Sequence, residues 1–492
     1  MSKTIIIIGA GLAGLSAALQ AAENGCNVKL VSSLPSERAQ SVMAEGGINA
    51  ALNTKDENDS PEEHFTDTIK AACGLADPNA VWGMTQAAPE LVHWLLKLGV
   101  KFNMSGYDDV DLRNFGGQKK KRTAFAQSDT GKQIMTAMID AVRRKEASGM
   151  VERFSHHSFL TLRLCGNICC GCVIRDEYSQ ETVELPGDAV IVATGGMHGL
   201  FGNTTGSLSN TGEVTAELFR LGVPLVNGEM IQYHPTTVEC GGKRMLISEA
   251  ARGEGGRLFA LRNNQPWYFM EEKYPELGNL MPRDITAREI WKVSHESEVF
   301  LDMTEISKEV ISNKLSGLAD DCMTYLHKDI RKEPVPVLPG IHYFMGGILV
   351  DEQHRTSIQN LYAAGECCAQ YHGANRLGGN SLLGALYGGR VAAKSACEQA
   401  DGVVLSCAAQ IDIPPASQIS EIKQLNKVMQ ETMGVVRNEN TLLNGIQTVQ
   451  ALTGNLPLLG MAVLKSALAR KESRGAHWRE DYPKSNDDDY LK

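Results

Sequence analysis

The sequence lacks the features that mark membrane-spanning, exported and nucleic-acid-binding proteins. No apolar run is long enough to cross a bilayer, and no signal peptide precedes the first apolar segment. The formal net charge of −10 argues against the basic surface that nucleic acid requires. We therefore expect a cytoplasmic protein with no nucleic-acid partner and no transmembrane segment, at most peripheral to the cytoplasmic face of a membrane.

The sequence also lacks the cysteine spacings that bind zinc or an iron–sulfur cluster. Its 12 cysteines are expected to be reduced thiols, because nothing directs the chain to an oxidising compartment. Three of them fall within residues 169–172, a strand-like stretch with no second cysteine pair nearby, so we interpret them as structural. We predict no metal site, and any cluster must belong to a partner.

The strongest motif lies in the first 33 residues. Four consecutive isoleucines predict a buried parallel strand, and a GxGxxG turn and a helix-like segment follow. In this motif Gly9 allows a tight turn, Gly11 lets the backbone approach a pyrophosphate, and Gly14 lets helix and strand pack closely. The phosphates would bind at the helix N-terminus, at Leu12 and Ala13. We interpret this as a dinucleotide site, with a structural glycine turn as the alternative.

One position departs from the pattern of nicotinamide-binding proteins. The acidic residue expected about 20 positions after the glycines is missing, and Ser32 and Ser33 stand there. Later segments favour FAD instead. Residues 188–196 predict a buried strand ending in small residues, as in many flavin-binding folds, namely Ala193, Thr194 and Gly195.

Two further segments fit a flavin. Residues 361–366 predict a third returning strand and end at Glu366, a carboxylate suited to a ribose or ribityl hydroxyl. Small residues in segment 38–49 would let the backbone lie flat against a planar ring, although a plain loop is the alternative. These small residues are Ser41, Ala44, Gly46 and Gly47.

Later motifs gather groups suited to a small dianion. Each group alone has a structural explanation, because a single histidine is usually a satisfied core residue. Together they supply forked guanidinium donors for carboxylates and imidazole hydrogen bonds. They are His234, Ser248, Arg252, Arg283, His342 and Arg376.

Elsewhere, Ser60 before Pro61 predicts a helix start, and the basic run 119–122 is interpreted as a solvated face.

At this point the sequence resembles the flavoprotein subunits of succinate dehydrogenase and fumarate reductase, and their relative L-aspartate oxidase. The resemblance extends from about residue 3 to residue 491, with motifs at 9–14, 231–236, 248–256, 281–284, 342–347 and 372–382. It implies an α/β fold in three parts: a Rossmann-like FAD-binding domain at 1–230 and 341–400, an α+β capping domain at 231–340, and a C-terminal helical domain at 401–492. It adds Glu213, Ser381 and Leu382 to the expected FAD contacts.

The resemblance also implies a mechanism. Arg283 would give a proton to one substrate carbon, Glu249 and Arg252 would relay protons to Arg283, and a hydride from the flavin would add to the other carbon. The two substrate carboxylates would be held by two pairs of side chains, His342 with Arg376 and His234 with Ser248. Fumarate and succinate are the implied substrates.

Phe115 indicates which branch of the family the chain resembles. L-aspartate oxidases carry a glutamate before the Gly-Gly pair, where it recognises the substrate amine, and here that residue is Phe115. A buried ammonium without a carboxylate partner is costly, so we favour fumarate or succinate. Segments 246–250 and 282–285 resemble the aspartate oxidases more closely, which keeps L-aspartate oxidase as the alternative. A FAD-binding protein without catalysis is a third hypothesis, and it predicts gaps in the set of site residues that we do not find.

Three positions depart from the family pattern. Gln40 stands where membrane-bound members have the histidine that links FAD covalently, so we expect non-covalent FAD. Glu213 replaces the usual aspartate. The sequence given ends at residue 492, earlier than the long respiratory subunits, which leaves open how it docks to the iron–sulfur subunit that the resemblance implies as a partner.

Overall fold

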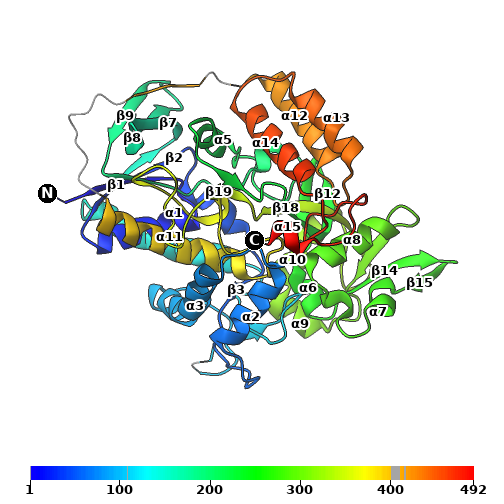
Figure 1. Ribbon diagram of the computed structural model, residues 1–492. Coiled ribbons are helices and arrows are strands. Elements are labelled where there is room, and N and C mark those ends of the chain that lie inside the picture. Colours follow the sequence, from blue (N-terminus) through cyan, green and yellow to red (C-terminus); the bar gives the residue numbers. More distant parts are fainter. Residues whose placement is uncertain (1, 108, 401–409, 415–416, 492) are drawn as a thin grey trace.

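The structure, a computed structural model, describes residues 2–107, 109–400, 410–414 and 417–491. Its central element is a five-stranded parallel sheet with the strand order β20-β10-β1-β2-β6. Figure 1 labels β1 and β2 of this sheet. Strand β20 comes from far along the chain and pairs beside β10, so late sequence completes the sheet begun by the first residues. The strands are β1 (Thr4–Ile8), β2 (Asn27–Ser32), β6 (Val151–Ser155), β10 (Ala189–Val192) and β20 (Leu361–Ala363).

The isoleucines of β1 alternate between two cores, as the period of two in a strand requires. Ile5 and Ile7 pack into a large core formed with helices, whereas Ile6 and Ile8 pack against strands on the opposite face. The helices are α1 (Leu12–Glu23), α2 (Pro61–Ala71), α3 (Pro78–Leu98), α4 (Thr130–Ala147) and α11 (Asn380–Gln399). The strands opposite belong to an antiparallel sheet of β7 (His157–Cys165), β8 (Ile168–Asp176) and β9 (Thr182–Pro186).

The segment between β11 (Leu225–Val226) and β19 (Gly347–Leu349) carries its own apolar core and lies at the lower right of Figure 1. Its first long strand, β12 (Ile231–Cys240), pairs with its last long strand, β18 (Leu338–Phe344). The chain therefore enters and leaves this segment at neighbouring positions. The other strands are β13 (Lys243–Leu246), β14 (Arg257–Arg262), β15 (Gln265–Trp267), β16 (Val299–Asp302) and β17 (Val335–Pro336). Its helices are α6 (Glu249–Gly253), α7 (Phe269–Lys273), α8 (Arg283–Val293), α9 (Lys308–Lys314) and α10 (Ser316–Asp321).

The tail forms helices that pack on one another and on α5 (Glu213–Arg220). Leu425, Met429 and Met433 lie at helical spacing and are fully buried in their shared core. These helices are α12 (Ile419–Thr432), α13 (Glu439–Val449) and α14 (Asn455–Ala469). The short α15 (Asp487–Tyr490) follows and has no buried residue. Residues 401–409 and 415–416 of the expected helical domain lie outside the described residues.

Short strands complete the fold. They are β3 (Ile48–Asn49), β4 (Leu112–Arg113) and β5 (Thr123–Ala124) in one sheet, and β21 (Cys368–Ala369) beside β19.

The cysteines of residues 169–172 lie buried in β8, and no group of three potential metal ligands occurs among the described residues. The expectation that every cysteine is a reduced thiol is wrong at Cys165, which is disulfide-bonded, because the expectation rested on compartment and not on proximity. The other cysteines that can be described are free thiols.

The interpretation of residues 119–122 as a solvated face is wrong for Arg122. Its side chain is fully buried, with Nη2 2.8 Å from an Asp59 oxygen and Nη1 3.0 Å from an Asp67 oxygen. Asp67 lies on α2, which starts at Pro61 after the Ser60 cap as predicted. Charge alone could not reveal that two buried carboxylates pair with one member of the basic run.

We expect Arg122→Ala to lower the free energy of unfolding by about 3–5 kcal/mol, because it leaves two buried carboxylates without their cation. Chemical denaturation of the flavin-loaded protein measures this change. Lys119→Ala, an exposed change in the same loop, should cost less than about 0.5 kcal/mol. Equal effects of the two substitutions would contradict the buried ion cluster.

Candidate active site

A single cavity of about 1140 Å³ runs from the ends of β1 and β2 to the segment between β12 and β18. Ligand pockets are typically about 300–1,000 Å³, so this one has room for a dinucleotide and a small acid. All the predicted FAD contacts except Gly14 line it, and so do most of the predicted substrate contacts. The fold therefore joins the two expected sites into one space.

The glycine turn after β1 has the geometry that close approach of a pyrophosphate requires. Gly9 has φ +110°, and a Cβ there would lie 2.2 Å from the Ala193 carbonyl oxygen. A Cβ on Gly14 would lie 1.9 Å from the Gly9 oxygen, so this glycine permits helix–strand packing and does not line the cavity. Gly11 is the N-cap of α1, and a Cβ there would lie 3.7 Å from Ser41 Oγ and 3.8 Å from the Ala39 Cβ.

All the other predicted cofactor residues line the cavity. They are Gly9, Gly11, Leu12, Ala13, Ser32, Ser33, Ser41, Ala44, Gly46, Gly47, Ala193, Thr194, Gly195, Glu213, Glu366, Ser381 and Leu382. Among the described residues, four buried polar atoms on the cavity wall lack a hydrogen-bond partner, namely Ser32 Oγ, Glu45 Oε2, Arg175 Nε and Arg376 Nε. Unpaired donors and acceptors in a cavity that also contains a glycine turn and a helix N-terminus fit the polar groups of FAD.

Sequence reasoning missed the residues at the end of the cavity beside β7 and β8. No motif marked them, because this sheet reads as ordinary alternating strands. His156 adopts φ +58° at the turn between β6 and β7, and its ring lies 5.2 Å from that of Tyr178. The lining residues there are His156, His157, Ser158, Phe159, Arg175, Glu177 and Tyr178.

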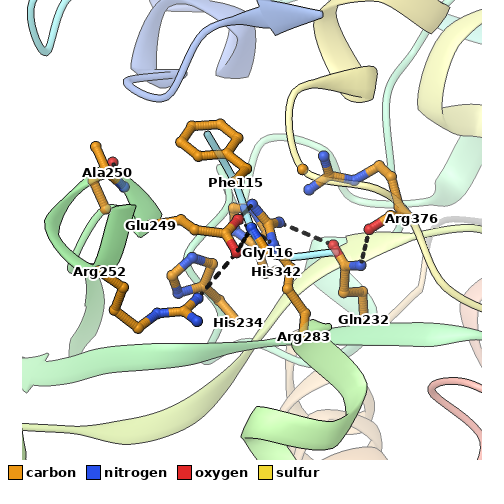
Figure 2. Close-up of polar contacts among 12 residues, drawn as sticks. Phe115, Gly116, Gln232, His234, Glu249, Ala250, Arg252, Arg283, His342 and Arg376 are labelled. Carbon is orange, nitrogen blue, oxygen red and sulfur yellow. Dashed lines mark hydrogen bonds and ion pairs between the residues drawn. The ribbon is translucent and has the colours of Figure 1, made fainter. Parts of the chain in front are cut away.

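At the opposite end Glu249 is clamped by two arginines (Figure 2). Its Oε2 accepts hydrogen bonds from Nε and Nη2 of Arg283 at 2.8 and 2.5 Å, and its Oε1 accepts one from Arg252 at 3.1 Å. Burial acts to raise the pKa of Glu249, but the two guanidinium groups outweigh it and lower that pKa below its ordinary value. Glu249 is therefore a carboxylate. Arg252 lies behind it and does not line the cavity.

Gln232 connects this cluster to Arg376. Its side-chain oxygen accepts a hydrogen bond from Arg283 at 3.0 Å, and its nitrogen donates to the Arg376 carbonyl at 2.8 Å (Figure 2). Burial, and then the nearby Arg283, lower the pKa of Arg376 to about 9, so it remains a cation at neutral pH. Gln232 was not predicted, because a glutamine beside a histidine carries no signal until its partners are known.

The two predicted histidines face each other, with ring centroids 5.1 Å apart. Burial and the neighbouring positive charges hold the pKa of both imidazoles well below the ordinary value. Both are therefore neutral at physiological pH. They line the cavity together with Arg283 and Arg376.

Phe115 and two glycines form the wall behind Glu249. Phe115 is 2% exposed, and the Gly116 N–H donates to Glu249 Oε1 at 3.2 Å. A Cβ on Gly378 would lie 2.8 Å from Glu249 Oε2 and 3.0 Å from the Phe115 ring. Ser248 caps α6 just ahead of Glu249 and lines the same cavity.

Gln40 and Glu45 border the cavity between the two ends. Gln40 accepts a hydrogen bond from the Ser207 N–H at 2.6 Å, so the side chain at the family's linking position has a protein partner. Burial, and then Asp321, raise the pKa of Glu45 to about 8, so this carboxyl is mostly neutral at pH 7. Glu45 lies within the small-residue segment 38–49 and was not predicted as a site residue.

Comparison with known proteins decides the family. The FAD binding domain family matches residues 4–382, and the fumarate reductase flavoprotein C-terminal family matches residues 453–492. The succinate dehydrogenase flavoprotein subunit of Bacillus subtilis is 38% identical, covering 100% of this chain and 93% of that protein. The chain belongs to the succinate dehydrogenase and fumarate reductase flavoprotein family. It is a FAD-dependent oxidoreductase, as the sequence predicted.

Two further relatives frame the comparison. A flavoprotein subunit of Escherichia coli quinol fumarate reductase has a TM-score of 0.90 at 27% identity, covering 100% of this chain and 94% of that one. L-aspartate oxidase of Caulobacter vibrioides is 36% identical over 97% of this chain and 93% of its own length.

No helix among the described residues is long and apolar enough to cross a membrane.

We expect Gly116→Ala to weaken binding of malonate, a small dianion, at least about tenfold, because its Cβ would lie 2.7 Å from Glu249 Oε1 and 3.0 Å from the Met281 carbonyl oxygen. The absorbance change of the bound flavin on titration measures the affinity. Gly434→Ala is the matched control, since its Cβ would meet only a carbonyl oxygen at 3.6 Å. Unchanged malonate affinity in Gly116→Ala would show that Glu249 need not be held in this position.

Proposed function

We propose that this chain is the flavoprotein subunit of an enzyme that interconverts fumarate and succinate, with fumarate reduction as the faster direction. The observation that supports this most strongly is the position of Arg283. Its guanidinium is clamped by Glu249 and lines the cavity together with His234, His342 and Arg376. A proton-carrying group thus lies among groups that can hold two carboxylates.

The substrate-holding groups suit a dicarboxylate. Arg376 presents a forked cation to one carboxylate, with His342 beside it. His234 and Ser248 lie along the same cavity and would hold the other carboxylate. Because Phe115 is apolar and buried, no side chain at that position pairs with a substrate ammonium.

Arg283 is the proposed proton donor to the substrate carbon. An arginine is a weak acid in water, with a pKa above 12, so it needs a closed, desolvated site and a relay that returns its proton. Glu249 contacts both Arg283 and Arg252 and provides that relay. FAD, when bound along the cavity, supplies or accepts the hydride at its N5 atom.

The direction and the partner follow from the resemblance. Gln40 cannot form the covalent flavin link of the membrane-bound members, and a flavin without that link generally has a lower potential in this family. A lower potential disfavours taking electrons from succinate. We therefore infer that electrons arrive from a separate iron–sulfur protein, in a cytoplasmic complex that is at most peripheral to the membrane.

L-aspartate oxidase remains the second candidate, because the Caulobacter enzyme is 36% identical over nearly the whole chain. It would need a carboxylate to pair with the substrate amine. Phe115 lacks one, and Glu45, a carboxyl of the cavity wall whose Oε2 has no hydrogen-bond partner, is held mostly neutral by burial. We therefore rank this activity below fumarate reduction.

Acid or heat precipitation should release all the FAD into the supernatant, because an amide at position 40 cannot be alkylated by the flavin methyl group. Absorbance of the supernatant and of the washed pellet measures the two fractions. Gln40→His offers the comparison, since only that variant carries an imidazole at the linking position. Yellow colour retained by the wild-type pellet would refute non-covalent binding.

Fumarate reduction with reduced viologen should be faster than succinate oxidation with a dye, and malonate should inhibit both. Oxidation of L-aspartate by oxygen should be slow, because its ammonium would be desolvated without a carboxylate partner. Phe115→Glu should shift the preference towards L-aspartate, with Phe115→Leu as the uncharged control. Rapid wild-type oxidation of L-aspartate with no turnover of fumarate would promote the second candidate.

A further inference from the structure

The hydroxyl of Thr205 contacts the imidazole of His342. Its Oγ1 lies 2.8 Å from Nδ1 of that histidine. The loop that carries Thr205 is fixed independently of this contact, because the Thr205 backbone N–H donates to the Ile341 carbonyl at 2.9 Å. Both residues line the cavity. The side-chain contact is therefore not required to place the loop.

The direction of this hydrogen bond sets which nitrogen of His342 carries the proton. A neutral imidazole has one N–H, and its position is set by the hydrogen bond that the other nitrogen makes. The Thr205 hydroxyl has one hydrogen, and its other acceptor, the Ile341 carbonyl, is at a longer distance of 3.4 Å. A hydroxyl that donates to Nδ1 leaves the proton on Nε2.

His234 has different contacts. Its Nδ1 lies 3.0 Å from the Thr236 carbonyl oxygen, and the Thr236 backbone N–H donates to the same nitrogen at 3.3 Å. One of these contacts needs a protonated Nδ1 and the other an unprotonated one, so they do not select a tautomer of His234. His342, whose ring centroid is 5.1 Å from that of His234, has a hydroxyl at Nδ1 that can select its tautomer.

We infer that Thr205 is a positioning residue that holds His342 as the Nε2–H tautomer, so that this imidazole donates a hydrogen bond to a substrate carboxylate without carrying a charge. The inference rests on the proposed function, since it takes a dicarboxylate as the substrate. The opposite tautomer would present a lone pair to that carboxylate and repel it. Thr205 thus acts through His342 and need not touch the substrate.

Two variants of the flavin-loaded protein test this inference. Thr205→Val keeps the shape of the side chain and the backbone hydrogen bond but removes the hydroxyl, whereas Thr205→Ser keeps the hydroxyl. Nitrogen NMR of protein labelled with ¹⁵N-histidine reports the tautomer directly, and His342→Gln assigns the signal. Malonate titration of the flavin absorbance measures the affinity for a dianion, with FAD content and the unfolding temperature as checks on folding.

We expect wild type and Thr205→Ser to show an unprotonated Nδ1 at His342, and Thr205→Val to lose this preference. Malonate affinity should fall about tenfold in Thr205→Val and stay within about twofold in Thr205→Ser. A protonated Nδ1 in wild type, or equal losses of malonate affinity in both variants, would overturn the inference. The tautomer is read without substrate, so wild-type protein that shows it but fails to reduce fumarate would refute only the proposed reaction.

Discussion

The buried charge of Glu249 is the constraint on which the site depends. The carboxylate is 2% exposed, and a charge so far from water is tolerated only when it is paired and hydrogen-bonded. Arg283 and Arg252 supply the pairing, which requires the first turns of α6 and α8 to meet. The absence of side chains at Gly116 and Gly378 gives the carboxylate its space, so three distant segments of the chain must close around one group.

Local sequence predicted those parts of the structure that local interactions decide. The isoleucine strand, the glycine turn and the capped start of α2 each need only neighbouring residues, and all three are present. Arg122 shows the limit, because its burial depends on Asp59 and Asp67, which lie about 60 positions earlier. Within a run of basic residues, the sequence does not show which side chain is buried against carboxylates and which is exposed to water.

The same distinction applies to the candidate site. The charged groups of the site could be predicted from separate sequence motifs. Arginine and histidine side chains beside glycines seldom have a purely structural role, so their presence together indicated a binding site. Gln232 was missed because its importance lies in joining Arg283 to the carbonyl of Arg376, a contact made only after folding. Arg252 shows the reverse case: a motif placed it in the site, whereas the structure places it behind Glu249 and away from the cavity wall.

The net charge of the cluster gives a physical reason for preferring a dicarboxylate without an amine. Three guanidinium groups, those of Arg252, Arg283 and Arg376, lie near the carboxylate of Glu249, and both histidines are neutral, so these groups carry a net charge of +2, with Glu366 as a further acidic residue on the cavity wall. Fumarate and succinate carry −2, which balances the charge of the named groups. L-aspartate carries −1, and it would be matched only if a further carboxylate lowered the charge of the site to +1. The buried Phe115 adds no such carboxylate, which supports the proposed preference for the dianion.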